Sequence, residues 1–96
     1  MSLPIVYTSE ALETLTAIYN FISNKFGVNS ADRFVLQAEK TINLIAEFPL
    51  MFKASSIDEK VRVGFISKQT SLFYKINSTS ITLLYFWDNR QDTIIK

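Results

Sequence analysis

Residues 61–87 of the 96-residue chain read VRVGFISKQTSLFYKINSTSITLLYFW, and this stretch decides the fold class. It contains three runs of β-branched, apolar and aromatic residues, and a short polar segment separates each run from the next. This pattern indicates strands joined by tight turns. We predict strands at residues 61–66, 71–76 and 81–87. Because consecutive strands joined by short turns pair antiparallel, they should form an antiparallel meander.

The part of the chain before residue 50 has a helical period instead. Apolar residues recur there at intervals of three and four in two stretches, which predicts two amphipathic helices. The two apolar stripes are Leu12, Leu15, Ile18, Tyr19, Ile22 and Phe26, and then Ala31, Phe34, Val35, Ala38, Ile42, Ile45 and Phe48.

Capping residues bound both helices and leave only a short connection between them. The expected caps are, in chain order, Thr8 or Ser9, then Gly27, then Asn29 or Ser30, and Pro49 ends the second helix. Helices joined so closely should form an antiparallel hairpin. Residues 5–7 read as a first strand and residues 50–60 as a loop. We therefore expect one α+β domain over residues 1–96, in the order β-α-α-β-β-β, with the helical hairpin packed on one face of an antiparallel sheet.

The chain contains no cysteine and no histidine. The first absence excludes disulfides and thiol nucleophiles. The second removes the commonest metal ligand and the usual general base near neutral pH. We therefore expect neither a metal nor another cofactor. No apolar run approaches the roughly 20 residues that span a bilayer, and the N-terminus lacks the features of a secretory signal, so we expect a cytoplasmic protein with no membrane partner.

The last predicted strand is apolar on both faces. By simple alternation Ile81, Leu83, Tyr85 and Trp87 share one face, and Leu84 and Phe86 the other. Two helices cover only one face of a sheet, and the uncovered face is normally polar. The open face is therefore predicted to bind a partner protein or a second copy of the chain. The alternative is that its aromatic residues pack against residues 50–60 and the C-terminal tail.

The chain resembles toxins of the RelE/ParE superfamily along nearly its whole length. The motifs that carry the resemblance are Ile5-x-Tyr-Thr with Ala11-Leu12, Ile18-Tyr19-x-Phe21-Ile22-x-x-x-Phe26-Gly27, Ala31-x-x-Phe34, Ile42-x-x-Ile45-x-x-Phe48-Pro49, Val61-Arg62, Leu72-x-Tyr74-x-Ile76, and Ile81-x-Leu83 leading to Asp88-x-Arg90. The long helical hairpin resembles ParE more than RelE. The resemblance implies the toxin of a type II toxin–antitoxin, plasmid stabilisation-type system, with a cognate antitoxin as its partner.

The two branches of the superfamily imply different targets. ParE toxins are associated with inhibition of DNA gyrase, whereas RelE toxins are endoribonucleases that cut messenger RNA on the ribosome. Some ribonuclease relatives have a basic residue and a histidine where this chain has Ser71 and Asp88, which disfavours the nuclease reading. A third alternative is a degenerate relative that only binds its antitoxin.

The candidate site residues follow from these alternatives. If the chain is a nuclease, the catalytic candidates are Arg62, Lys68, Arg90 and Tyr85, because RNA cleavage needs proton transfer and cations beside the phosphate. The partner-binding candidates are Arg62, Phe73, Tyr85, Trp87 and Arg90. Without histidine or cysteine, proton transfer would need a strongly shifted lysine, tyrosine or carboxylate, so we expect toxicity to depend on binding.

Overall fold

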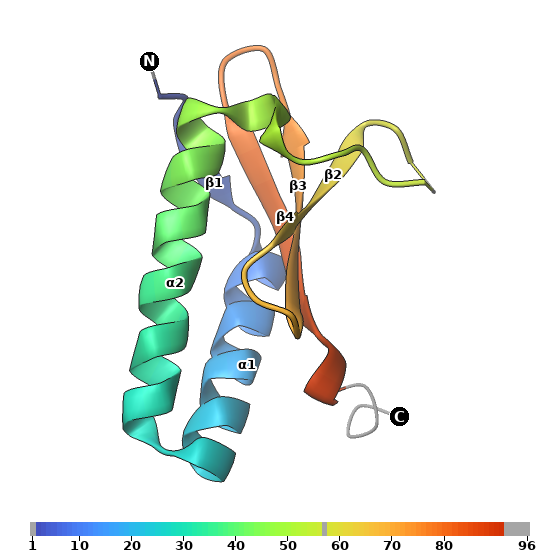
Figure 1. Cartoon of the computed structure of the whole chain (residues 1–96). Coiled ribbons are helices and arrows are strands. Elements are labelled where there is room, and N and C mark those ends of the chain that lie inside the picture. The colour runs from blue at the N-terminus through green and yellow to red at the C-terminus, as the bar shows by residue number, and fades with distance from the viewer. Residues whose placement is uncertain (1, 57, 92–96) are drawn as a thin grey trace.

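A computed structural model describes residues 2–56 and 58–91 (Figure 1). Its elements are β1 (Ile5–Tyr7), α1 (Ser9–Phe26), α2 (Val28–Glu47), the 3-10 helix η1 (Pro49–Met51), β2 (Val61–Phe65), β3 (Thr70–Ile76), β4 (Ile81–Asp88) and the 3-10 helix η2 (Asn89–Gln91). This confirms the order β-α-α-β-β-β. Both helices lie on the same side of the sheet, so the molecule has one helical layer and one sheet layer. No helix in the described ranges combines the length and apolarity needed to cross a membrane.

The sheet is mixed rather than wholly antiparallel. Its strand order is β1-β4-β3-β2, and the meander β2-β3-β4 is antiparallel as predicted. β1 adds itself beside β4 in the parallel sense, with Ile5 opposite Ile81. A parallel pair needs a long connection between its strands, and the helical hairpin with β2 and β3 provides one between β1 and β4.

The hairpin turns at a single glycine. Gly27 has φ 99°, in the region that favours glycine, and it is both the C-cap of α1 and the N-cap of α2. α2 begins directly at Val28, and its N-cap makes no side-chain hydrogen bond. The prediction that Asn29 or Ser30 caps α2 is therefore wrong, because the tight turn leaves no loop residue for that position. The N-cap of α1 is Thr8, as predicted, and its side chain accepts from the Ala11 N–H.

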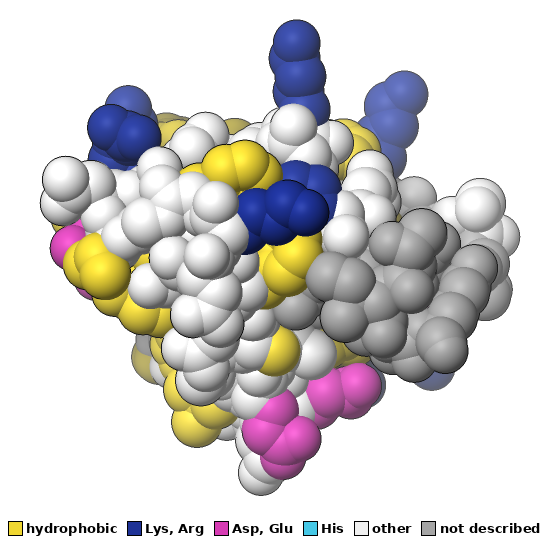
Figure 2. Space-filling model, turned by 90° about the horizontal axis from the view of Figure 1, so that it is seen from below, with side chains coloured by type: hydrophobic (Ala, Val, Ile, Leu, Met, Phe, Trp, Pro, Cys, Tyr) yellow, Lys and Arg dark blue, Asp and Glu magenta, His cyan; other side chains and the backbone are white. Residues whose placement is uncertain are grey.

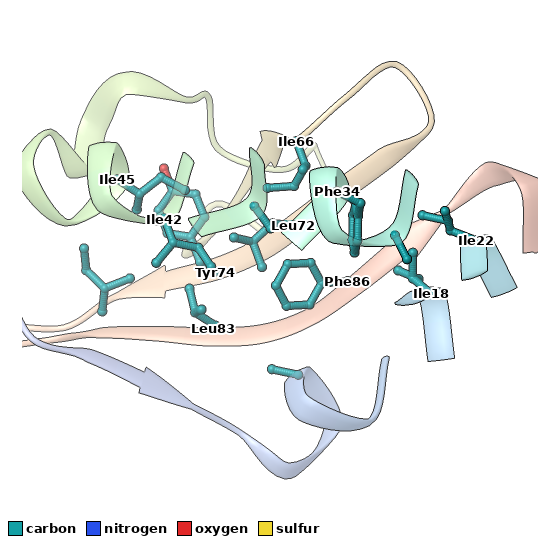
Figure 3. Packing of buried hydrophobic residues seen from close by; sticks show 14 residues of the cluster. Ile18, Ile22, Phe34, Ile42, Ile45, Ile66, Leu72, Tyr74, Leu83 and Phe86 are labelled. Atoms are coloured by element: carbon teal, nitrogen blue, oxygen red, sulfur yellow. The ribbon is translucent and has the colours of Figure 1, made fainter. Parts of the chain in front are cut away.

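The core lies between the hairpin and the covered face of the sheet (Figure 3). Side chains from both layers meet there and are almost fully excluded from solvent. They include Ile18, Ile22, Phe34, Ile42 and Ile45 from the helices and Leu72, Tyr74, Leu83 and Phe86 from the strands. These helical residues belong to the two predicted stripes, so the helical period identified the middle of the covered face. Leu12, Phe26 and Phe48 of the same stripes are more than half exposed, so the prediction is wrong for them.

A β-bulge in β4 changes which residues face the helices. Phe73 lies opposite Tyr85, but the next residue of β3, Tyr74, lies opposite Leu83, so Leu84 is an extra residue in β4. Beyond it the alternation shifts by one. Phe86 is therefore buried with Leu83, whereas Tyr85 and Trp87 turn to the open face. The predicted grouping of Ile81 and Leu83 with Tyr85 and Trp87 on one face is wrong for this reason.

Both long strand edges are covered within the chain. On the β2 edge, Ser55 N–H donates to Val61 O at 2.6 Å and Val63 N–H donates to Lys53 O at 3.2 Å. On the β4 edge beyond β1, threonine hydroxyls replace a strand. Thr8 Oγ1 donates to Leu84 O at 2.7 Å, and Thr14 Oγ1 accepts from Phe86 N–H at 2.8 Å. These bonds protect edges that would otherwise pair with another chain.

Candidate partner-binding surfaces

The open face of the sheet carries an aromatic cluster. The rings of Phe73 and Tyr85 stack with centroids 4.5 Å apart and planes 15° apart. Trp87 is 38% exposed and Phe65 is 63% exposed, on flanking positions of the same face. Val63, opposite Phe73, completes this set. We call these five residues the open-face cluster; aromatic side chains of this kind are enriched where proteins bind one another.

A groove runs along one side of the open-face cluster. Its volume is about 710 Å³, and it lies between the segment 51–56 and the side chains of Val63, Phe65 and Phe73. Phe52 meets Phe65 edge-on, with centroids 6.2 Å apart. The segment after η1 thus forms a wall of the groove rather than a cover over the aromatic residues. The alternative that residues 50–60 bury the open face is not what the structure shows, and the C-terminal tail, residues 92–96, lies outside the described residues.

Arg62 lies on the other face of the sheet. It is opposite Tyr74, which is buried beneath the helices, and its Nη1 donates to the carbonyl oxygen of Phe52. Gly64 determines which residues of β2 face the helices. The Phe52 ring packs where a side chain at position 64 would stand, 3.0 Å from an added Cβ. Val61 and Val63 therefore point to the open face, whereas Arg62, although named as a partner-binding candidate, does not.

Arg90 is held by a buried carboxylate at the end of β4. Its Nε donates to Asp88 Oδ1 at 3.0 Å and its Nη2 to Asp88 Oδ2 at 2.8 Å. The Asp88 side chain is fully buried and also accepts from the Thr70 hydroxyl at 2.6 Å. The guanidinium of Arg90 lies 6.0 Å from the ring centroid of Phe21 and 5.8 Å from that of Phe26, both on α1. The side chain is thereby fixed at the hairpin end of the molecule.

The pKa of Asp88 gives this ion pair a measurable signature. Burial acts to raise the pKa, but hydrogen bonds from Arg90 and Thr70 and the charge of Arg90 outweigh it, so the pKa lies below 3.8. A carboxylate with a lowered pKa stabilises the fold above its unfolded pKa, and this contribution is lost as the pH falls through the folded value.

We therefore expect Asp88→Asn to be less stable than the wild type at neutral pH but to lose less stability on acidification. The difference in unfolding free energy should be constant above about pH 5 and shrink steadily below about pH 4. Urea unfolding at a series of pH values measures it. Glu13→Gln, on the exposed surface of α1, is the control and should follow the wild type. Parallel curves for wild type and Asp88→Asn would show that Asp88 does not carry the acid sensitivity.

The four catalytic candidates do not form one site. Arg62 is on the covered side of β2 and Tyr85 is on the open face. Lys68 is exposed in the β2–β3 turn, whose Gln69 O accepts from Asn89 N–H at 2.8 Å, so Lys68 and Arg90 come from adjacent elements. Burial, and then the charge of Glu10, raises the pKa of Tyr85 above 10.0. Within residues 2–56 and 58–91, no three acidic, His or Cys side chains are grouped to hold a metal ion.

The sequence analysis did not identify all the residues that form the open-face cluster and the Asp88–Arg90 ion pair. Phe65 was read only as part of a strand, although it is among the most exposed aromatic residues. Thr70 was missed, although it anchors Asp88; a threonine opposite an aspartate in paired strands is the signal that would have found it. Of the predicted partner-binding residues, Phe73, Tyr85 and Trp87 share the open face, whereas Arg62 and Arg90 lie elsewhere.

Comparison with known proteins places this geometry in a family. Residues 5–93 match the family model described as "ParE toxin of type II toxin-antitoxin system, parDE". The chain belongs to this family. The match includes every helix and strand of the domain, and it confirms the superfamily and the ParE branch that the motifs indicated. No protein among the curated ones matches the sequence.

Solved structures share the fold of this ParE-family chain at low sequence identity. A chain of the chromosomal ParDE toxin–antitoxin system from P. aeruginosa has a TM-score of 0.77 at 17% identity, with 91% of this chain and 96% of that chain covered. The YoeB dimer from Staphylococcus aureus gives 0.65 at 14%, covering 91% and 97%. The E. coli DinJ–YafQ toxin–antitoxin complex gives 0.63 at 10%, covering 96% and 98%. At these identities the likeness concerns the fold.

Proposed function

We propose that this ParE-family chain is a toxin that acts by binding DNA gyrase, not by cleaving RNA. A cognate antitoxin neutralises it by covering the open-face cluster and the adjoining groove. Membership of the ParE family supports the choice of target. The structural observation that supports a binding mechanism is that the candidate catalytic side chains do not lie together in one site.

RNA cleavage by the 2′-hydroxyl needs a base, an acid and cations within reach of one phosphate. Here Arg62 and Tyr85 lie on opposite faces of the sheet, and Arg90 is engaged by Asp88. Tyr85 is the only one of the four candidates on the open face, and burial raises the pKa of its hydroxyl, which makes it a less available base. Arg62 and Tyr85 therefore cannot reach one phosphate together, because the sheet lies between them.

The antitoxin proposal rests on the character of the open face. The open-face cluster presents apolar and aromatic area beside a groove of about 710 Å³. Lys53 at the groove and Lys75 on β3 are exposed, so the matching segment should combine apolar anchors with acidic residues. Two of the structural neighbours are described as a toxin–antitoxin system and a toxin–antitoxin complex, which supports a partner of this kind. A second copy of the chain is the alternative occupant, since another neighbour is a dimer.

A RelE-like endonuclease acting on ribosome-bound message is the alternative function. The observation that favours it is the adjacency of Lys68 and Arg90, which brings two cations to one end of the molecule. A degenerate relative that only binds its antitoxin is the third possibility. The three differ in outcome: the proposed toxin inhibits supercoiling, the endonuclease arrests translation, and the degenerate relative does neither.

DNA supercoiling by purified gyrase tests the proposal. Added toxin should inhibit the reaction, and the cognate antitoxin should restore it when present in slight excess. Uninhibited supercoiling, with folded toxin at concentrations far above those of gyrase, would exclude gyrase as the target. Translation of a reporter message in the same preparation then separates the endonuclease from the degenerate relative.

A further inference from the structure

A basic pocket lies at the hairpin end of the molecule, away from the open-face cluster. It is bounded by the α1–α2 hairpin, the β2–β3 turn and η2, and its volume is about 290 Å³. Figure 2 looks onto this end: Lys or Arg side-chain atoms lie near the centre beside hydrophobic ones, other Lys and Arg side chains project from the upper rim, and acidic side chains lie toward the edge. The polar residues of the pocket are Arg33, Arg90, Ser30, Gln37, Ser67 and Gln69, and none of the described residues that line it is acidic.

The two arginines differ in how their charge is balanced. Arg90 is oriented by Asp88 through Nε and Nη2, which leaves Nη1 without a hydrogen-bond partner in the described part of the chain. Arg33 donates to Ser30 Oγ at 3.2 Å and has no ion pair among the described residues. Arg90 is thus oriented by its ion pair, whereas the charge of Arg33 is balanced by no acidic side chain among the described residues. Among the described residues, the charges of Arg33, Arg90 and the buried Asp88 sum to +1.

The donors of the pocket suit a phosphate group. Two guanidiniums and two side-chain amides offer more N–H groups than the two oxygens of a carboxylate can accept, whereas a phosphate presents three or four oxygens. A guanidinium that is already oriented loses less side-chain freedom when it binds a phosphate. The hydrogen bonds to Asp88 orient the guanidinium of Arg90 in this way. Ile22, Phe26 and Phe34 form an apolar floor, and Phe26 is 53% exposed.

The geometry points to a binding site for a phosphate group carried by a nucleotide, with the phosphate between Arg33 and Arg90 and the base against Phe26. The volume exceeds that of a lone phosphate and approaches the lower bound of small-ligand pockets, about 300 Å³. Exposed aromatic rings beside arginine are surfaces on which bases stack. The site is separate from the surface proposed for the antitoxin, so it is available in both the free and the neutralised toxin.

Amide chemical shifts of the purified, isotope-labelled chain test this site. Inorganic phosphate, adenosine, AMP and a 5′-phosphorylated tetranucleotide are titrated separately. We expect saturable shifts at Ser67 and Gln69 with the three phosphate compounds and none with adenosine. AMP should bind more tightly than inorganic phosphate because of the apolar floor. Tetranucleotide binding stronger than that of AMP would assign the site to a strand end, and equal binding would assign it to a free nucleotide.

Arg33→Gln should weaken AMP binding about tenfold, because it removes a charged donor to the phosphate. Lys75→Gln removes the same charge from the open face and should change binding less than about twofold. Arg33 is exposed on α2, so the substitution leaves the core unchanged. The proposal is overturned by an absence of saturable shifts, by equal weakening in both variants, or by adenosine or inorganic phosphate binding as tightly as AMP. The titration involves no gyrase and is independent of the proposed function.

Discussion

Phe86→Ala is expected to lower the free energy of unfolding by about 3–5 kcal/mol, the range for deleting a buried aromatic ring. Phe86 is 2% exposed and packs between β4 and the helical hairpin, directly after the bulge (Figure 3). A domain of this size has a total stability of roughly 5–15 kcal/mol, so the loss is a large part of it. Urea unfolding monitored by circular dichroism measures the change.

The control for this variant is Phe65→Ala. It makes the same substitution on β2, two strands away in the sheet, but Phe65 is 63% exposed and touches Phe52 only edge-on. We expect a loss below about 1 kcal/mol. If Phe86→Ala fails to fold, Phe86→Leu provides the measurement and should cost about 1–1.5 kcal/mol. Equal losses for Phe86→Ala and Phe65→Ala would contradict the placement of the bulge. Without the extra residue in β4, Phe86 would lie on the open face, as Phe65 does.

Phe73→Glu is expected to weaken the complex with the cognate antitoxin by at least about 30-fold, which corresponds to the loss of an interface hot spot of about 2 kcal/mol. Phe73 stacks on Tyr85 and lines the groove, so it stands at the centre of the proposed interface. A carboxylate there would be desolvated by the antitoxin without a partner and would repel its acidic residues. Calorimetric titration of the antitoxin into the toxin measures the affinity.

Leu36→Glu is the matched control for the interface. Leu36 is 66% exposed on α2, in the helical layer rather than on the open face, and the substitution adds the same charge. Its effect on antitoxin affinity should be less than about threefold. Both variants should retain the circular dichroism spectrum of the wild type. Unchanged affinity in Phe73→Glu, or equal loss in the two variants, would place the antitoxin on another surface.

The helical hairpin could be predicted closely because each helix has one apolar stripe. A period of 3.6 residues selects a single covered face, and Gly27 and Pro49 mark where the helices end. The strands were also found at nearly their observed positions. What the local pattern could not show was the partner of β1, because pairing with β4 depends on residues more than 70 positions away.

The faces of the strands were predicted less well, for two physical reasons. In β4 both alternating sets are apolar, so an extra residue at Leu84 leaves no trace in the hydrophobic pattern. In β2 the more apolar set, Val61 and Val63, lies on the open face, because the Phe52 ring occupies the space beside Gly64 on the covered one. β2 thus reverses the usual rule that the apolar set of a strand points inward.

The candidate site was predicted in part. Phe73, Tyr85 and Trp87 were named and do share a face, but they were brought together by the bulge rather than by the alternation from which they were inferred. Arg90 was named as a catalytic and a partner-binding candidate, and the structure pairs it with Asp88 of the same chain. Arg33 was not considered, because an exposed arginine on a helix is ordinary in sequence and gains meaning only beside Arg90.

Binding rather than cleavage is tested most directly by mapping the 5′ ends of a message translated by purified ribosomes in the presence of the toxin. The wild type, Arg62→Ala and Arg90→Ala are compared, each shown to be folded by circular dichroism. We predict no codon-position cleavage by any of the three, while the wild type inhibits supercoiling by gyrase. Cleavage by the wild type that disappears in both folded variants would contradict the binding mechanism and establish an endonuclease.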